Sequence, residues 1–203
     1  MKPGWLYTFF AVLVFCSGCS MHVNVDGEIK RFIRETGAGK SGVPPLSPGE
    51  FRAVTRKAYN EGEFLDSFLA WLEYKFQYGE EMSGLEGRLL LPKIKDDPRL
   101  ELCLQLSLGI IPRDKAGIIS RLDEMKKENL NRGHIIDLLK GSELARTGEH
   151  EKAKGLLLEA LKINPYLVEA YKILEEIYDK TGQKEMGRQC LELARNLRMK
   201  YRH

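Results

Sequence analysis

Apolar residues recur every three or four positions over much of the chain, the spacing of amphipathic helices. The segment SPGE at 47–50 offers a capping serine, a proline at the first helical position and a glutamate three residues after the serine. It predicts a helix to about Asn60, ended by Gly62. A second helix is expected over 63–78. Its aromatic face could line a ligand groove but is more typical of a core, and it consists of Phe64, Phe68, Trp71, Leu72 and Lys75.

The middle of the chain is less regular. Residues 79–87 are predicted to form a loop, with a short helix possible at 85–91. In 96–112 the alternating leucines fit a strand, whereas apolar spacings of three and four also fit a helix. Asp97 before Pro98 is a helix start signal and leucine favours helix, so we predict a helix there and another over 113–128.

The last third of the chain repeats itself after 34 residues. From His134 the first copy reads HIIDLLKGSELARTGEHEKAKGLLLEALKINP, and small and apolar residues recur in the second copy. The matching positions are Gly141, Leu144, Gly148, Ala153, Leu157, Ala160 and Pro165, then Tyr171, Leu174, Tyr178, Gly182, Gly187, Leu191 and Ala194. The pattern resembles a pair of tetratricopeptide (TPR) repeats, over about 134–167 and 168–201.

This resemblance implies an all-α fold, a right-handed superhelical stack of helical hairpins (a TPR-like α-solenoid). About three or more repeats are needed for a stable stack. We therefore expect residues 47–132 to form a degenerate helical-hairpin region that completes the stack begun by the TPR region at 133–203. The segment Asn60-Glu61-Gly62-Glu63-Phe64 imitates the turn of such a repeat.

The residue pattern supports paired helices without reference to the family. One apolar helical face is formed by Ala153, Leu156, Leu157, Ala160 and Leu161. Gly141 and Gly187 carry no side chain, which lets paired helices approach closely. Asp137, Lys140 and Glu175 depart from the repeat pattern, which predicts that the first helix of the first copy is partly exposed or differently packed.

The N-terminus has the features of an export signal. A weakly positive start is followed by the apolar run 5–15, too short to cross a bilayer as a helix, and then by small residues before Cys19. This resembles a bacterial lipoprotein signal peptide at 1–18, with Cys19 lipidated; an ordinary secretory signal is the alternative. A Cys16/Cys19 redox or metal dithiol is disfavoured because neither the required flanking elements nor a second cysteine pair is present. Residues 19–46 are predicted to be a flexible tether because 37–45 are rich in glycine and proline, although 21–35 could form a short strand or one or two helical turns.

Composition and motifs argue against several kinds of chemistry. Lysine plus arginine (32) nearly balances aspartate plus glutamate (29), and no long basic block indicates nucleic acid. Gly39-Lys40-Ser41 copies the end of a phosphate-binding loop, but its first glycine would fall on Arg34 and Pro44 blocks the required helix, so we expect no nucleotide. The histidines are scattered, and we expect no metal, cofactor or catalytic residue. Cys103 and Cys190 are interpreted as small buried residues, with a disulfide as the alternative.

These observations predict a non-catalytic adaptor of the bacterial envelope. It would be anchored by a lipid. Ser20 follows the cysteine, and the resemblance to enterobacterial lipoproteins implies the outer membrane, facing the periplasm, when that residue is not aspartate. The resemblance to tetratricopeptide lipoproteins implies that the partner is an envelope, secretion or pilus assembly protein. The alternative is an enzyme, or its regulatory subunit, that acts on the cell wall. If the first helix of each repeat lines a groove, the candidate partner-binding residues are Ser142, Arg146, Glu169, Lys172, Glu176 and Lys180.

Overall fold

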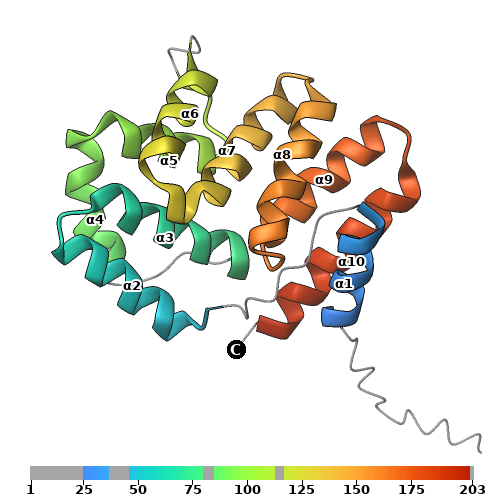
Figure 1. Ribbon diagram of the computed structural model, residues 1–203, viewed down its shortest axis with the longest axis horizontal. Helices are drawn as coiled ribbons and strands as arrows, with labels where there is room; N and C mark the ends of the chain where they lie inside the picture. The colour runs from blue at the N-terminus through green and yellow to red at the C-terminus, as the bar shows by residue number, and fades with distance from the viewer. Residues whose placement is uncertain (1–24, 37–45, 80–84, 113–116, 202–203) are drawn as a thin grey trace, which may run out of the picture.

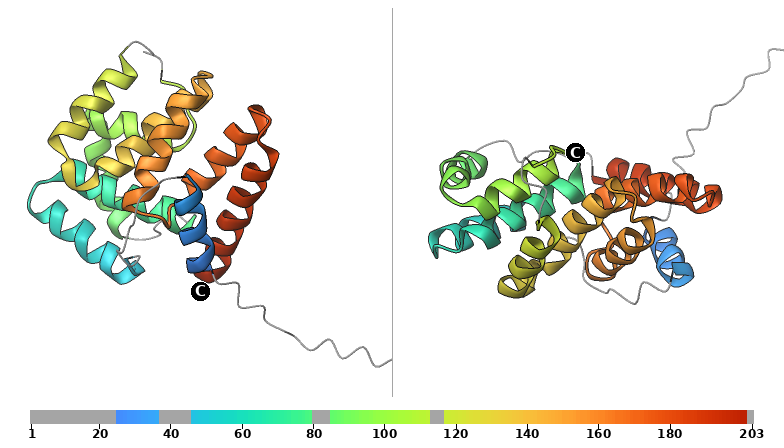
Figure 2. Two further views of the ribbon diagram at one scale, coloured as in Figure 1. Left: turned by 45° about the vertical axis from the view of Figure 1, so that its right-hand side comes forward. Right: turned by 90° about the horizontal axis from the view of Figure 1, so that it is seen from above.

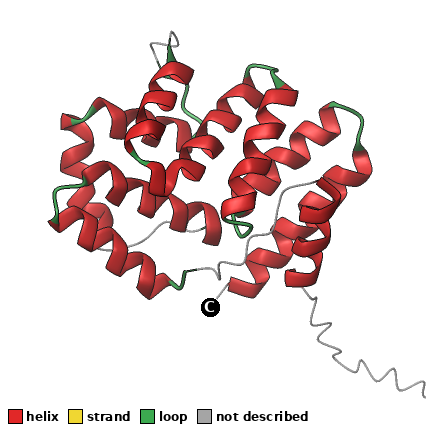
Figure 3. Ribbon diagram, viewed as in Figure 1, coloured by secondary structure: helices red, strands yellow, loops and turns green. Residues whose placement is uncertain are grey.

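A computed structural model describes residues 25–36, 46–79, 85–112 and 117–201. These residues form helices and loops without any strand, so the prediction of an all-α fold is confirmed for them (Figure 3). The elements are α1 (Val25–Thr36), α2 (Pro48–Asn60), α3 (Phe64–Tyr78), α4 (Leu85–Asp96), α5 (Pro98–Ser107), α6 (Ile118–Glu128), the 3₁₀ helix η1 (Leu130–Arg132), α7 (Gly133–Arg146), α8 (His150–Ile163), α9 (Val168–Lys180) and α10 (Lys184–Tyr201).

Local sequence signals account for the helix starts. The hydroxyl of Ser47 accepts a hydrogen bond from the backbone N–H of Glu50 at 3.3 Å, and the Glu50 carboxylate accepts one from the Ser47 N–H at 2.6 Å. This is the predicted capping box. Asp97 caps α5 by accepting from the Arg99 N–H at 2.9 Å, so residues 98–107 are helical and the strand alternative is wrong. Near 85, the helix is longer than expected and continues through Pro92 to Asp96.

Three helical hairpins have turns of the same type. Gly62, Gly148 and Gly182 each have a positive φ, between 78° and 88°, after α2, α7 and α9 respectively. In each turn the N–H after the glycine bonds the carbonyl five residues earlier, as in Glu63 to Ala58 at 2.9 Å, and the glycine N–H bonds the carbonyl three residues earlier. These are Schellman motifs, which end a helix and reverse the chain. The turn expected at 60–64 is therefore built like the turns of the two repeats.

Helix α3 lies against the ends of the two C-terminal hairpins, opposite their tight turns (Figures 1 and 2). It contacts α7, α9 and α10, and it is buried on nearly every side. The predicted aromatic face belongs to the core: Phe68 and Leu72 are buried, and Phe64 and Trp71 pack against the main cluster. Helix α2 is attached to α3 by aromatic contacts, with the Phe51 and Tyr74 ring centroids 5.7 Å apart.

Helix α7 is differently packed rather than exposed. It is buried along most of its length because α6 and α5 also pack against it. The two departures from the repeat pattern on α7 form ion pairs with α6: Asp137, 3 % exposed, lies 2.6 Å from the Lys126 ammonium, and Lys140 lies 2.6 Å from the Asp123 carboxylate. Polar side chains replace the usual apolar ones because they meet charged partners from a neighbouring helix.

The predicted tether is wrong for residues 25–36. This segment forms helix α1, which packs against α8 and α10 (Figure 2). Ile29 and Phe32, one turn apart, are 3 % and 2 % exposed, and Phe32 meets Tyr171 edge to face at 5.4 Å. Burial of these two large apolar side chains docks the helix on the core.

The two described cysteines are free and buried, as interpreted from the sequence. Burial raises the pKa of the Cys103 thiol to about 12, and burial also raises the pKa of Cys190. Because the thiolate is the reactive form, both side chains act as small apolar core residues.

The first prediction concerns the contact between α7 and α8. A Cβ atom on Gly141 would lie 2.9 Å from Leu157 Cγ and 3.3 Å from the Ala153 carbonyl oxygen. Gly141→Ala, and more so Gly141→Leu or Ala153→Phe, should lower the free energy of unfolding by about 1–3 kcal/mol, because overpacking separates the helices. Denaturant unfolding followed by circular dichroism measures this change.

Gly155 supplies the matched control. It lies within α8 but nothing surrounds its Cβ position within 4 Å. Gly155→Ala should raise stability by about 0.5–1 kcal/mol, because alanine favours helix over glycine. Equal effects at both positions would contradict the close approach of α7 and α8.

Candidate functional site

A buried polar cluster joins α3 to the two C-terminal hairpins, and we call it the polar hub. Its side chains come from α3, from the start of α7 and from the loop after α8. They are Asp66, Glu73, Gln77, Arg132, His134 and Asn164.

Glu73 is the centre of the polar hub. Its carboxylate is 6 % exposed and receives three partners: the Arg132 guanidinium, His134 Nε2 at 2.8 Å and the Asn164 amide at 2.8 Å. An ionised carboxylate only accepts hydrogen bonds, so Nε2 of His134 carries a proton. Buried charges are tolerated when they are paired and hydrogen-bonded in this way.

The surroundings of Glu73 favour its charged form. Burial alone would raise the pKa of this carboxyl, but the hydrogen bond and charge of His134, the charge of Arg132 and the Asn164 hydrogen bond outweigh burial and lower it. The Glu73 carboxylate thus uses its hydrogen bonds to hold together α3, the start of α7 and the loop after α8. The arrangement suits a structural link better than proton transfer.

Sequence reasoning missed the polar hub. His134 and Asn164 lie 61 and 91 positions from Glu73, and no periodicity relates such separations. Asp66, Glu73 and Gln77 follow one another on α3 at spacings of 7 and 4 residues, so their side chains share one face of that helix. The signal available in the sequence was this row of polar residues on a helix that is otherwise largely apolar.

The candidate partner-binding residues occupy α7 and α9 without forming one cluster. Arg146 pairs with Glu143 on its own helix, and Lys172 lies 2.6 Å from Glu169 on its own helix. Ser142 is half-buried, whereas Glu176 and Lys180 are exposed. Within the described ranges, no hydrogen bond or ion pair joins the α7 members to the α9 members. The set is a pair of mixed-charge helix surfaces.

A separate depression of about 600 Å³ lies where α5, α6 and the segment after α5 meet. Two of its apolar lining side chains, Ile110 and Ile111, are each about half exposed. Arg121 also lines it, and no acidic side chain in the described part of the chain pairs with this guanidinium. The depression is lined by Pro98, Glu101, Leu102, Gln105, Ile110, Ile111, Pro112 and Arg121.

The remaining predictions concern the proposed lipidation site, the phosphate-binding decoy, membrane spans and metal sites. Cys19 and the decoy Gly39-Lys40-Ser41 fall outside the described ranges. In the part of the chain that is described, no helix is long and apolar enough to cross a bilayer, and no group of three or more His, Cys, Asp or Glu side chains is placed to hold a metal ion.

Comparisons with models of known protein families, with curated proteins and with solved structures find no match to this chain.

The second prediction tests the charge at the centre of the polar hub. Glu73→Gln should lower the free energy of unfolding by about 1.5–3 kcal/mol near pH 7, because the buried Arg132 guanidinium loses one of its two carboxylate partners and keeps only Asp66 at 3.3 Å. The pKa of Glu73 is below its ordinary 4.5 in the folded protein, so its contribution is present above that pH and is lost as pH falls through the folded pKa. The difference between native protein and variant should shrink below about pH 4.

Glu159→Gln is the matched control for the same denaturation series. Glu159 is exposed and pairs with Lys162 one turn away. Exposed pairs contribute at most about 1 kcal/mol, so this variant should change stability little at any pH. Similar losses in the two variants would show that the polar hub is not a stabilising link.

Proposed function

We propose that this chain is a lipid-anchored envelope lipoprotein, a non-catalytic adaptor or assembly factor that binds another envelope protein through TPR-like hairpins. The observation that carries the adaptor role is the depression between α5 and α6, which is lined by the exposed side chains of Ile110 and Ile111. Exposed apolar patches mark interaction surfaces because they are costly to leave in water.

The hairpin turns support the family resemblance. Three Schellman turns of one construction, at Gly62, Gly148 and Gly182, follow the first helix of each pair. The small residues Gly141 and Ala153 lie at the close contact between α7 and α8, where the repeat pattern requires them. We infer from these features that the hairpins are TPR-like and stack as a right-handed superhelix.

The chemistry of the depression indicates its occupant. Apolar side chains offer contact area, and the Arg121 guanidinium can donate hydrogen bonds to a carboxylate of the partner. We propose that it binds a partner segment with an apolar side chain followed by an acidic group. The mixed-charge surfaces of α7 and α9, with Arg146 and Lys172, are the second surface that such a partner could contact.

The alternative function is that of an enzyme, or its regulatory subunit, that acts on the cell wall. It requires a carboxylate that faces an open groove and is essential for activity but not for folding. Glu73 is enclosed by Arg132, His134 and Asn164, so it is a poor candidate. Full hydrolytic activity of the purified protein on cell wall, with no protein partner, would favour the enzyme over the adaptor.

The third prediction concerns the anchor. Cys19→Ala should abolish incorporation of radioactive palmitate in bacterial cells, because the lipidated thiol is lost. Cys16→Ala is the control and should keep the label, since signal cleavage would remove Cys16. Persistent labelling of Cys19→Ala would contradict the proposed anchor.

The fourth prediction concerns the partner. A photoreactive residue at Ile110 should crosslink one protein reproducibly in intact cells. Arg121→Glu should lower that yield severalfold, because it would repel an acidic segment. Arg146→Glu with Lys172→Glu tests the second surface by affinity capture of the same partner.

Lys152→Glu with Arg188→Glu is the matched control. These two cations also pair with a glutamate one turn away on their own helices, as Arg146 and Lys172 do. The control should leave capture unchanged. No protein crosslink from Ile110, or equal loss of capture in control and test variants, would contradict the adaptor.

A further inference from the structure

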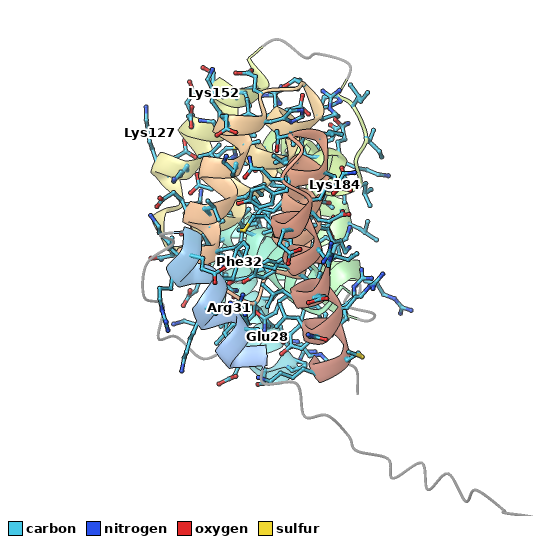
Figure 4. All side chains as sticks on the ribbon, turned by 90° about the vertical axis from the view of Figure 1, so that its right-hand side faces the viewer. Glu28, Arg31, Phe32, Lys127, Lys152 and Lys184 are labelled. Carbon is cyan, nitrogen blue, oxygen red and sulfur yellow. The ribbon has the colours of Figure 1, made fainter. Side chains whose placement is uncertain are left out.

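Helix α1 runs antiparallel to α10. The Asn196 amide donates a hydrogen bond to the Glu28 carboxylate at 3.0 Å, near the start of α1 and the end of α10. Arg31 and Phe32, further along α1, line a small cavity with Glu185 and Gln189 from the first half of α10. In Figure 4, Lys184 lies in the upper half of the molecule, Phe32 lies below it near the middle, and Glu28 lies lower still. The first turn of α1 and the last turn of α10 are therefore at one end of the molecule.

The docking of α1 shortens the link to the proposed anchor. Only residues 20–24 separate Cys19 from Val25, and an extended chain spans at most about 3.3–3.6 Å per residue. The start of α1 therefore lies within about 21 Å of Cys19. A tether that reached freely to residue 46 would allow about 90 Å. If Cys19 is anchored in the membrane, the end of the molecule that carries the start of α1 must stay close to the membrane.

That end of α10 is basic and partly apolar. After Glu192, α10 contains no acidic residue and three basic ones, Arg195, Arg198 and Lys200, all exposed. Met199 is 64 % exposed and lies one turn after Arg195 on the same helix face. Nearby Glu28 is engaged by Asn196. Basic side chains around an exposed apolar one match the charge of anionic headgroups and the apolar region beneath them.

We infer that α1 holds the C-terminal turns of α10 against the anionic phospholipid surface in which Cys19 is anchored, so that the molecule has a fixed membrane-facing end. This inference rests on the proposed lipid anchor. The proposed orientation places the hairpin turns at Gly148 and Gly182 on the side that faces away from the membrane. Helix α10 begins just after Gly182 and ends at the membrane.

The test uses the full acylated protein in vesicles of phosphatidylethanolamine and phosphatidylglycerol, with lipids that carry a headgroup quencher. A fluorophore is attached to Met199→Cys, or to Lys152→Cys near the opposite end as the matched control (Figure 4). The native Cys103 and Cys190 are buried and do not compete for the label. We expect severalfold stronger quenching at position 199 than at position 152.

Charge and docking variants test the cause of this orientation. Each basic side chain near an anionic surface changes binding about fivefold, so Arg195→Glu with Lys200→Glu should bring quenching at 199 close to that at 152. Lys127→Glu with Lys184→Glu, at the far end, should leave it unchanged. Phe32→Ala, with its helical content checked by circular dichroism, should also weaken quenching at 199, because α1 loses its contact with Tyr171.

The outcomes separate this inference from the proposed function. Acylated protein quenched equally at 199 and 152 overturns the fixed orientation and leaves the anchor standing. Strong quenching at 199 that is the same when phosphatidylcholine replaces phosphatidylglycerol overturns the role of anionic lipid. Mass spectrometry that shows Cys19 without acyl chains overturns both the anchor and this inference.

Discussion

The buried carboxylate of Glu73 is the interaction on which the arrangement of the helices depends. A charge that is only 6 % exposed is unfavourable unless its partners are in place, and those partners come from the start of α7 and from the loop between α8 and α9. Gln77 extends the link, because its amide donates to the Leu46 carbonyl at 3.3 Å ahead of α2. One polar cluster thus ties the N-terminal hairpin to both C-terminal hairpins. Apolar packing supplies the stability of each pair, while the polar hub specifies how the pairs meet.

This division of roles has a consequence for function. The charged groups that are best enclosed are engaged in holding the fold, whereas the outer surfaces of α7 and α9 and the depression beside Ile110 are left accessible. Helix α1 adds a second constraint, because Ile29 and Phe32 dock it on α8 and α10. A protein proposed to bind partners at a membrane would gain from such a constraint, since it limits the orientations in which the partner surfaces are presented.

Local features could be read correctly from residues in one segment. The capping box at Ser47, the start of α5 at Asp97 and the hairpin turn at Gly62 each depend on residues within a few positions of one another. The apolar face of α8 was equally visible, because its spacing follows the geometry of a single helix. Helix α1 was misjudged because its apolar residues are few, and glycine and proline follow it closely.

The amino-acid sequence by itself determined the all-α class, the hairpin pairs and the buried state of Cys103 and Cys190, since these follow from spacing, turn residues and side-chain polarity. Only the tertiary structure decided that α3 crosses the ends of the C-terminal hairpins, that Asp137 meets Lys126, and that α1 docks on α10. The physical reason is that these contacts join residues far apart in the chain. Their energies depend on which surfaces meet in three dimensions, and no local pattern of residues records that choice.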